Sequence, residues 1–496
     1  MKSTIFRSLV ILVGLPFTAA ISEIRNPTKQ YRYTSGAVMD AIMVKKRATW
    51  EAQEAAGLMD STIYPSYTGA GPVLCVDGVA QVIPGDANNI FRCKNCSLRQ
   101  RSGTADAAFQ IDFYDFKSHA DLGSVTGRGS STWGWTSPKG REFIAIAQAD
   151  GAAFAEVSPK GKLIYLGRLP HFPKANPIIW REIRGYKNYI LVGSEADYHG
   201  IQIFDMTKLV DIDPVKPLTF SGDADLTGHF TRLPVGRTHN VVVNEELNYA
   251  VAVGAKPRDS ECASGLIFID LSDPSKPTSP GCAAGDGYVH DAQCLVYRGP
   301  DKAYAGRDIC YGYNEDTLTI YDVTNKSTTN IISRTSYDGA SYTHQGWVTD
   351  MQWQTMLVLD DEYDEVNSAG AGSKQFPITY FWNITSLETP VLTGFFRNEY
   401  AQCIDHNQFV INGTAYQSNY GAGLHVLDVS SLSTDPTGAG VSEAGFFDIY
   451  PEDDNLPEGG TVAFVGTWGH YPFFPSGFIV VNTIERGAFV VKRSNA

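Results

Sequence analysis

Phe268-Ile269-Asp270-Leu271 is one of seven short β-rich runs that recur along the chain and decide its fold. The other copies are Ala153-Phe154-Ala155-Glu156-Val157, Ile203-Phe204-Asp205-Met206, Ile320-Tyr321-Asp322-Val323, Phe381-Trp382-Asn383-Ile384, Val426-Leu427-Asp428-Val429 and Phe489-Val490-Val491-Lys492. The acid, amide or, in the last copy, lysine falls at positions 156, 205, 270, 322, 383, 428 and 492, at intervals of 45 to 65 residues. A period of about 40 to 50 residues plus loop insertions is typical of four-stranded propeller blades. The sequence therefore predicts an all-β, seven-bladed β-propeller over residues 106–496.

Closure of this ring depends on a segment that precedes the first blade. Only four residues follow Lys492, so the last blade lacks an outer strand of its own. Residues 109–116 alternate as a strand does, and we expect them to pair with the last blade and remove its exposed edge. The acids that end the runs are predicted to cap turns, because Asp and Asn side chains accept backbone N–H bonds there. A row of β-sandwiches is the weaker alternative, since each sandwich would end on its own strands.

The first 20 residues have the three parts of a secretory signal. A basic start is followed by apolar residues 9–17 and by small residues ending at Ala20, where we expect cleavage. No later run reaches about 20 apolar residues, which predicts no membrane span. Residues 21–105 are predicted to form an N-terminal extension, with one amphipathic helix at Ala37–Leu58 packed beneath the main domain and cysteine-pinned loops after it.

Cysteines and glycosylation sequons agree with export. The eight cysteines are expected to pair as Cys262–Cys282, Cys294–Cys310, Cys75–Cys93 and Cys96–Cys403. Acceptor sequons for N-glycosylation lie at Asn95, Asn325, Asn383 and Asn412. The formal net charge of −14 disfavours nucleic acid as a partner, because phosphates require neutralisation by Lys and Arg. We therefore expect a secreted, extracellular glycoprotein.

Four histidines stand at the start of four successive predicted blades. The innermost strand of every blade lines the central channel, so these residues should converge although they are far apart in the sequence. The set is His239, His290, His344 and His406, flanked by Asn240, Asp291, Gln345, Asp405 and Asn407. Four imidazoles could bind a divalent metal or an anionic ligand and titrate near neutrality, with Asp291 and Asp405 orienting the rings. The alternative is structural: each pair satisfies backbone groups and locks neighbouring blades together.

Two other clusters have competing interpretations. The run Asp360-Asp361-Glu362-Tyr363-Asp364-Glu365 is expected to be a solvated acidic turn, with a Ca²⁺ site as the alternative. The aromatic residues Trp133, Trp135, Trp347 and Trp468 lie at or before first strands. We expect them to pack between blades, with a platform for stacking sugars as the alternative.

Polar and aromatic motifs recur at the first strands of several blades. They include Thr132-Trp133-Gly134-Trp135-Thr136, Arg237-Thr238-His239-Asn240-Val241, Gly287-Tyr288-Val289-His290-Asp291, Tyr342-Thr343-His344-Gln345-Gly346-Trp347, Asp405-His406-Asn407 and Tyr471-Pro472-Phe473-Phe474-Pro475. Together they resemble the choice-of-anchor B family, which is related to the LVIVD-repeat β-propellers, over residues 109–492. The resemblance implies an extracellular propeller but no particular activity. The chain departs from the family at Trp468-Gly469-His470, and Cys96 and Cys403 look like additions.

These observations favour a secreted binding or scaffold propeller with its ligand at the mouth of the histidine-lined channel. The expected partner is an extracellular ligand, such as a protein or a cell-wall component, and a divalent metal is the one cofactor that the pattern suggests. The alternative is a metal-dependent hydrolase or lyase that uses a metal-activated water in the same channel.

Overall fold

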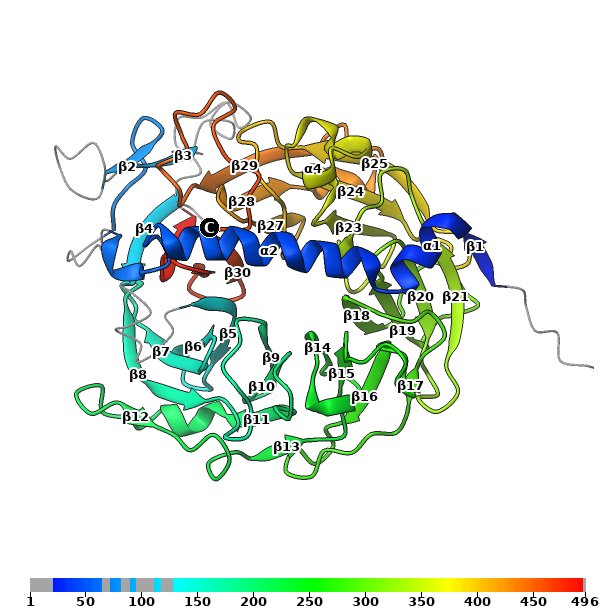
Figure 1. Ribbon diagram of the computed structural model, residues 1–496, viewed down its shortest axis with the longest axis horizontal. Helices are drawn as coiled ribbons and strands as arrows, with labels where there is room; N and C mark the ends of the chain where they lie inside the picture. Colours follow the sequence, from blue (N-terminus) through cyan, green and yellow to red (C-terminus); the bar gives the residue numbers. More distant parts are fainter. Residues whose placement is uncertain (1–20, 65–71, 82–89, 95–110, 117–127, 494–496) are drawn as a thin grey trace, which may run out of the picture.

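The computed structural model describes residues 21–64, 72–81, 90–94, 111–116 and 128–493. Within them, seven β-sheets are arranged around a central axis (Figure 1). The predicted seven-bladed propeller is thus confirmed. The predicted signal sequence, the sequon at Asn95 and Cys96 lie outside the described residues. None of the described helices is both long and apolar enough to cross a membrane.

Each blade is an antiparallel sheet that begins with its innermost strand. Blades 1 to 3 comprise β5 (Gly129–Thr136), β6 (Glu142–Gln148), β7 (Gly151–Val157) and β8 (Leu163–Pro170); β9 (Arg181–Tyr186), β10 (Tyr189–Ser194), β11 (Ile201–Asp205) and β13 (Gly228–Phe230); and β14 (Asn240–Asn244), β15 (Tyr249–Val253), β16 (Leu266–Asp270) and β17 (Cys282–Ala283). A short strand, β12 (Leu218–Thr219), runs parallel to β8.

The other four blades follow the same plan. They comprise β18 (Asp291–Val296), β19 (Asp308–Tyr313), β20 (Leu318–Asp322) and β21 (Asn330–Thr335); β22 (Thr343–Val348), β23 (Met356–Asp361), β24 (Ile378–Asn383) and β25 (Val391–Arg397); β26 (Gln408–Ile411), β27 (Thr414–Asn419), β28 (Gly423–Asp428) and β29 (Ser442–Phe447); and β30 (Thr467–Tyr471), β31 (Phe478–Thr483) and β32 (Ala488–Arg493). Short helices connect some strands: α4 (Asp364–Asn367) and 3₁₀ turns at Met206–Leu209, Pro234–Gly236, Gly370–Lys374 and Ser430–Ser433.

The middle strands of the blades are apolar on both faces because each blade packs between two neighbours. Every residue of β6, β15, β23 and β31 is buried. Between blades 1 and 2, for example, Phe154 stacks on Phe204 with ring centroids 4.8 Å apart. The hydrophobic core is therefore a ring of inter-blade layers that surrounds the channel rather than filling it.

The predicted turn caps are confirmed in five of the seven repeats. In each, the side chain accepts a hydrogen bond from the backbone N–H two residues further on, and the pairs are Asp205–Thr207, Asp270–Ser272, Asp322–Thr324, Asn383–Thr385 and Asp428–Ser430. Glu156 differs and forms an ion pair with Arg141. These capping side chains therefore shape the turns of the blades.

The N-terminal segment closes the ring as predicted. Strand β4 (Ile111–Phe116) pairs antiparallel with β32 along its full length and becomes the outer strand of blade 7. The edge of β32 is therefore covered by a strand from the other end of the chain.

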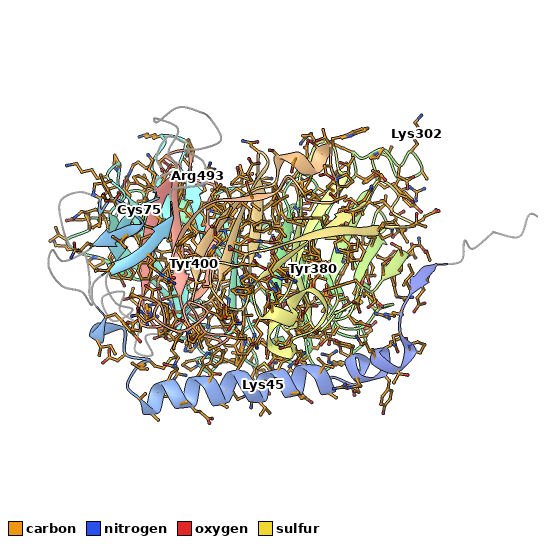
Figure 2. The ribbon with its side chains drawn as sticks, turned by 90° about the horizontal axis from the view of Figure 1, so that it is seen from above. Lys45, Cys75, Lys302, Tyr380, Tyr400 and Arg493 are labelled. Carbon is orange, nitrogen blue, oxygen red and sulfur yellow. A yellow bond between two sulfur atoms is a disulfide. The ribbon has the colours of Figure 1, made fainter. Side chains whose placement is uncertain are left out.

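The N-terminal extension does more than the sequence predicts. The expected helix is present as α2 (Ala37–Ala55), but it is preceded by β1 (Ser22–Ile24), which pairs parallel with β21, and by α1 (Pro27–Thr34). Helix α2 crosses one face of the ring (Figure 1), and the edge-on view in Figure 2 shows it lying along that face. The hairpin of β2 (Val79–Gln81) and β3 (Ile90–Lys94) extends blade 6 through β29. We refer to residues 21–60 as the N-terminal arm.

Three of the four predicted disulfides are confirmed: Cys75–Cys93, Cys262–Cys282 and Cys294–Cys310. The last joins neighbouring positions on β18 and β19. Cys403 is buried and forms no disulfide with a described cysteine. Its predicted partner, Cys96, lies outside the described part of the chain, so that pairing stays a prediction.

Candidate functional site

The four predicted histidines form one continuous row, which we call the histidine layer. The ring centroids of His239 and His290 lie 4.3 Å apart, those of His290 and His344 4.1 Å apart, and those of His344 and His406 4.4 Å apart. His239, His290 and His406 lie just before the innermost strands β14, β18 and β26, and His344 is the second residue of β22. The prediction that remote imidazoles become neighbours around the axis is therefore correct in geometry.

One nitrogen of most of these rings connects neighbouring blades. Nδ1 of His290 lies 2.8 Å from the backbone oxygen of His344, and Nδ1 of His406 lies 2.5 Å from that of Trp468. A carbonyl oxygen only accepts, so Nδ1 carries the hydrogen and Nε2 keeps a lone pair. At the end of the row, His239 Nδ1 lies 2.5 Å from Glu195. The structural interpretation accounts for the Nδ1 atoms and leaves Nε2 available.

The expectation that these imidazoles titrate near neutrality is wrong for three of them. Burial holds the pKa of His290 and His344 well below its usual value, and neighbouring imidazoles and Lys46 add to this effect. Burial also lowers the pKa of His406 to about 4, although Glu362 opposes the shift. Their rings are therefore neutral at physiological pH, because removal from water penalises the charged form.

The flanking polar residues act mostly on the backbone. The Asn240 side chain accepts from the N–H of Val241, the Gln345 side chain from that of Gln408, and Asn407 donates to the carbonyl of Trp468. These hydrogen bonds fix the inner strands and their separations. They support the alternative that the polar pairs lock blades together.

The expected orienting carboxylates do not contact the imidazoles. Asp291 accepts from the N–H of Ala292 and lies 3.7 Å from Arg184, and burial raises its pKa to about 7. Neither carboxyl oxygen of Asp405 has a hydrogen-bond partner among the described residues. Burial and the nearby acids Asp360 and Asp364 raise its pKa far above the usual range. Asp360 instead meets the ring of His344, at 3.2 Å from Nδ1.

The acidic run is not the solvated turn that the sequence suggests, because all five carboxylates are buried. Asp361 accepts from the backbone N–H groups of Ser341 and Tyr342, and Asp364 accepts from the hydroxyl of Tyr380. The run begins in the last two residues of β23, beside the histidine layer, and continues past the strand. Its acids are therefore buried there, against backbone and tyrosine donors.

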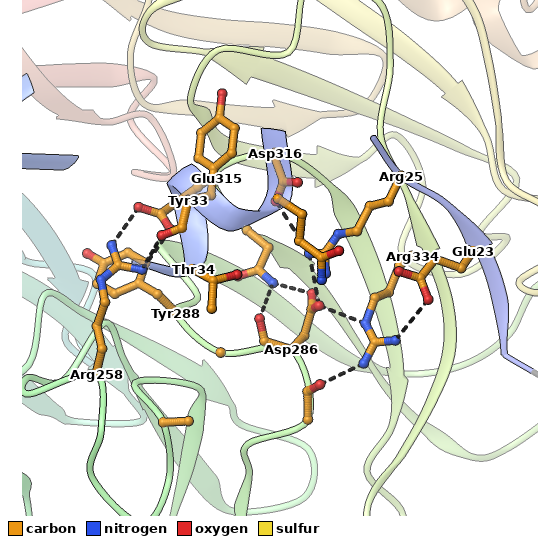
Figure 3. Close-up of a pocket in the computed structure, with 15 residues that line it drawn as sticks. Glu23, Arg25, Tyr33, Thr34, Arg258, Asp286, Tyr288, Glu315, Asp316 and Arg334 are labelled. Atoms are coloured by element: carbon orange, nitrogen blue, oxygen red, sulfur yellow. Dashed lines mark hydrogen bonds and ion pairs between the residues drawn. The ribbon is translucent and has the colours of Figure 1, made fainter. Parts of the chain in front are cut away.

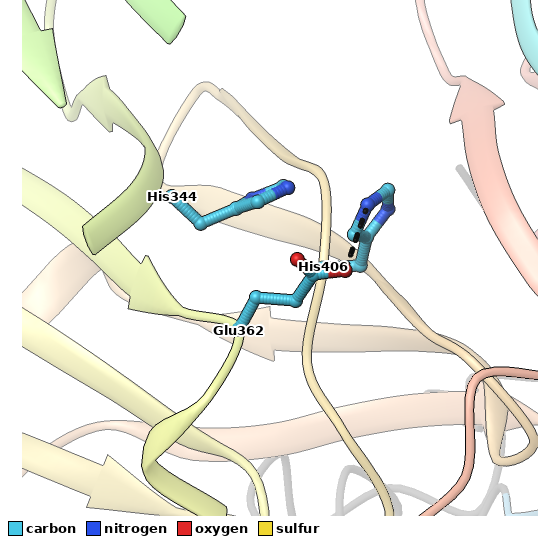
Figure 4. Close-up of side chains that lie close together, drawn as sticks. All are labelled: His344, Glu362 and His406. Carbon is cyan, nitrogen blue, oxygen red and sulfur yellow. Dashed lines mark ion pairs between the residues drawn. The ribbon is translucent and has the colours of Figure 1, made fainter. Parts of the chain in front are cut away.

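Glu362 is the exception, since it faces the histidine layer and pairs with a cation from the N-terminal arm. Its two carboxylate oxygens lie 2.6 and 2.9 Å from Nζ of Lys46, and the hydroxyl of Tyr420 donates to it over 2.5 Å. Burial acts to raise the pKa of Glu362, but the Lys46 ammonium, His406 and the hydroxyl of Tyr420 together more than offset this, so the pKa lies below its usual value. His406 Nε2 lies 3.6 Å from the same carboxylate (Figure 4).

The N-terminal arm covers this end of the channel. Residues Met39, Ile42, Lys46 and Trp50 of α2 are buried, and the apolar ones pack on aromatic residues that precede the inner strands. Trp50 donates from Nε1 to the carbonyl of Phe464 over 2.8 Å, and its ring centroid is 5.2 Å from that of Trp180. We call this covered end the histidine end.

Ion pairs hold the start of the arm against blades 3 and 4. Arg25 lies 2.9 Å from Asp286, which also meets Arg334 at 2.7 Å, while Arg258 lies 2.7 Å from Glu315 (Figure 3). A cavity of about 310 Å³ lies among these side chains. Since its charged groups are paired with one another, this region anchors the arm.

The other end of the channel is open, and we call it the open mouth. A cavity of about 340 Å³ lies where the inner strands β14, β18 and β22 end, beside exposed Glu245 and Glu246. The cavity extends along these strands toward the histidine layer, since Asp291 and Gln345, which directly follow His290 and His344, also line it. Aromatic rings line this mouth: Trp347 lies 5.1 Å from Phe409, and Trp133 lies 5.8 Å from Phe473.

Unpaired donors accompany these rings. Gln293 is buried, and because its Oε1 accepts from the N–H of Val348, its Nε2 has no partner among the described residues. The indole Nε1 of Trp347 is likewise buried and finds no acceptor in the described part of the chain. The guanidinium of Arg184 lies 5.1 Å from the centroid of the Trp133 ring. All four side chains line the cavity.

Sequence reasoning missed Lys46 and Gln293 as site residues, and it considered Glu362 only within the acidic run, as part of an alternative Ca²⁺ site. A signal for Lys46 was present: Met39, Ile42 and Trp50 form the apolar stripe of the helix, and Lys46 occupies a core position within it. The sequence predicts that four tryptophans at or before first strands pack between blades. Trp135 and Trp468 are buried as expected, whereas Trp133 and Trp347 also line the open mouth.

Comparison with protein-family models and with curated proteins finds no match. Among solved structures, the computationally designed Ika8 protein aligns with a TM-score of 0.44 and 9% identity, over 86% of this chain and 98% of that one. The β-propeller domain of Cps50 (Swd1) from Myceliophteria thermophila aligns with a TM-score of 0.42 and 11% identity, over 72% of this chain and 95% of that one. These are distant likenesses, and the assignment of seven blades rests on the sheets described above.

Proposed function

We propose that this protein is a secreted, glycosylated binding propeller, akin to the choice-of-anchor B family, whose ligand enters the channel at the open mouth. The β-propeller fold suits a binding or scaffold role. The histidine end is covered by α2, so a ligand reaches the channel from the opposite side.

Two unpaired donors carry this proposal. A buried N–H group without an acceptor costs about 1–3 kcal/mol, so native proteins rarely retain one without a reason. Here Gln293 Nε2 and Trp347 Nε1 both belong to side chains that line one cavity. An acceptor supplied by a ligand would satisfy them.

The surroundings suggest the chemical class of that ligand. Aromatic faces combined with a few fixed polar groups favour a ligand with an apolar ring face and many oxygen acceptors. A sugar ring has both properties. We therefore favour a cell-wall polysaccharide as the ligand, and a protein ligand would be the other outcome of the test below.

Export is supported by independent features. The structure has three disulfides, which persist in oxidising compartments. The sequon residues Asn325 and Asn412 are exposed, as glycan attachment requires, whereas Asn383 is only partly accessible.

Retention on insoluble polysaccharides tests the binding proposal. The purified protein is mixed with chitin, β-1,3-glucan or cellulose, and the fraction that sediments is measured. We expect retention on at least one of them and at least a tenfold weaker affinity for Gln293→Leu and Trp347→Ala, because each removes a donor worth about 1–3 kcal/mol.

Trp353→Ala is the matched control, since Trp353 is 54% exposed and lies outside the cavity. It should bind as the wild type does. Failure of all three polysaccharides to retain the folded protein would contradict the sugar assignment, and equal retention of Gln293→Leu would contradict the placement at the open mouth.

A metal-dependent hydrolase or lyase is the second candidate. It is favoured by one observation: ligand atoms of His344, Glu362 and His406 all lie within 4.8 Å of one another. This candidate depends on metal binding at that cluster, where a metal-bound water would be the nucleophile.

A further inference from the structure

We propose that His344, Glu362 and His406 form a site for a divalent transition metal. The ammonium group of Lys46, from the N-terminal arm, now pairs with Glu362 in place of the metal ion. The site lies at the histidine end and does not depend on the ligand proposed for the open mouth. It therefore adds a second, separate binding activity to the molecule.

The three side chains have the right composition. Two imidazoles and one carboxylate form a common ligand set for Zn²⁺ and Fe²⁺ and leave further positions open. His406 Nε2 lies 3.6 Å from Glu362, and every pair of ligand atoms is within 4.8 Å (Figure 4). Tetrahedral Zn²⁺ places its ligand atoms about 3.3 Å apart, so the widest pair has to approach by up to about 1.5 Å to bind one ion.

The outer contacts present the lone pairs of both imidazoles. His406 donates from Nδ1 to the carbonyl of Trp468, and His344 meets Asp360 Oδ1 through Nδ1. In metal sites a carboxylate or carbonyl typically holds the non-ligating nitrogen in this way, which fixes the tautomer and the ring orientation. Nε2 of each ring is therefore the ligating atom.

The carboxylate requires a cation at this position. Glu362 is fully buried, and an isolated buried charge is strongly unfavourable unless an opposite charge compensates it. Lys46 now supplies that charge, with Nζ within 2.9 Å of both oxygens. A metal ion at the cluster would take over the same role, so the ammonium and the metal compete for one carboxylate.

Lys46 is suited to such an exchange because it belongs to the arm rather than to a blade. It reaches the channel from a single surface helix, past the rings of Phe464 and Trp468, whose centroids lie 5.1 and 6.0 Å from Nζ. The three ligands, by contrast, belong to blades 5 and 6: His344 and His406 lie at the start of inner strands, and Glu362 directly follows β23. The arm therefore acts as a tethered cation that limits access of the metal.

Zn²⁺ titration of metal-stripped protein by calorimetry tests this proposal. Lys46→Gln removes the competing charge while keeping a hydrogen-bond donor for Glu362. We expect this variant to bind one Zn²⁺ at least tenfold more tightly than the wild type, and adding His406→Gln to it should abolish the gain. Lys45→Gln is the matched control, because Lys45 is the exposed neighbour on α2, and it should bind as the wild type does.

His239→Gln in the Lys46→Gln background separates the three ligands from the rest of the histidine layer, and we expect it to leave Zn²⁺ binding unchanged. Folded Lys46→Gln protein that binds no Zn²⁺, or binding that survives His406→Gln, would overturn the proposal. If Lys46→Gln does not fold, the wild type decides: its weaker Zn²⁺ binding must be lost in His344→Gln, and equal binding by the two proteins would overturn the site.

Discussion

Glu362→Ala should lower the free energy of unfolding by about 3–5 kcal/mol, the largest effect we expect from any single charge in the molecule. The substitution leaves the ammonium of Lys46 in a buried position, where its side chain is only 7% exposed, without the carboxylate that compensates it. It also removes the acceptor of the Tyr420 hydroxyl. The cost reflects the stranded partner more than the value of the ion pair itself.

A double-mutant cycle measured by urea denaturation checks this reason. Lys46→Met/Glu362→Leu replaces both charges with apolar groups, and we expect it to recover most of the stability that Glu362→Ala loses. Lys45→Met, at the exposed neighbouring position, should change stability by less than about 0.5 kcal/mol. If the double variant is as unstable as the sum of the two single variants, the stranded charge is not the cause.

Trp50→Ala should also destabilise the protein by about 3–5 kcal/mol and release the C-terminal half of α2 from the blades. Trp50 is 5% exposed, packs on Trp180 and donates to the carbonyl of Phe464, so truncation creates a cavity and leaves an acceptor unpaired. Since α2 is a single helix on the surface of the ring, few other contacts compensate for this loss.

Thermal unfolding and amide hydrogen exchange measure the effect. The amides of residues 46–55 should lose protection in Trp50→Ala while those of β23 and β31 keep it, because the arm opens locally and the blades do not. Val44→Ala is the matched control, since Val44 lies on the same helix and is 66% exposed. Uniform loss of protection in the arm and the blades would contradict a separable arm.

The fold follows from local sequence to a large extent because a propeller repeats one supersecondary unit. Each blade contributes a similar signal, an apolar third strand that in five of seven copies ends in a turn-capping acid or amide, and the seven copies suffice to count the blades. Closure could be predicted as well, because residues 109–116 alternate as a strand does and stand before the first blade. Such arguments need only the neighbourhood of each residue.

The candidate site is different because it joins segments that no local pattern connects. Lys46 and Glu362 are 316 positions apart, and their pairing depends on where the arm crosses the ring. The same limitation explains the wrong expectation for the acidic run. Its five carboxylates suggest solvent exposure, yet Asp361, Asp364 and Glu365 accept hydrogen bonds from groups just before β22 and from β24, which the sequence of the run cannot reveal.

For the histidine layer, the sequence predicts the positions of the rings correctly and their protonation wrongly. Topology alone predicts that the four rings converge, because all inner strands face the axis. Their protonation depends instead on burial beneath α2. The position of α2 over the histidine end cannot be predicted from the sequence of the arm. The channel is thus closed at the histidine end and open at the other, which divides it into a covered cluster of metal-type ligands and an accessible, aromatic-lined cavity.

Histidine modification by diethyl pyrocarbonate, mapped by peptide mass spectrometry, tests most directly whether the arm seals the histidine layer. The reagent acylates neutral imidazoles, so access and not protonation limits the reaction at His290, His344 and His406. We predict that these three stay unmodified in the wild type while partly exposed His171 reacts, and that they become modified in Trp50→Ala. Modification of His290 and His344 at the rate of His171 in the intact, folded protein would contradict the account.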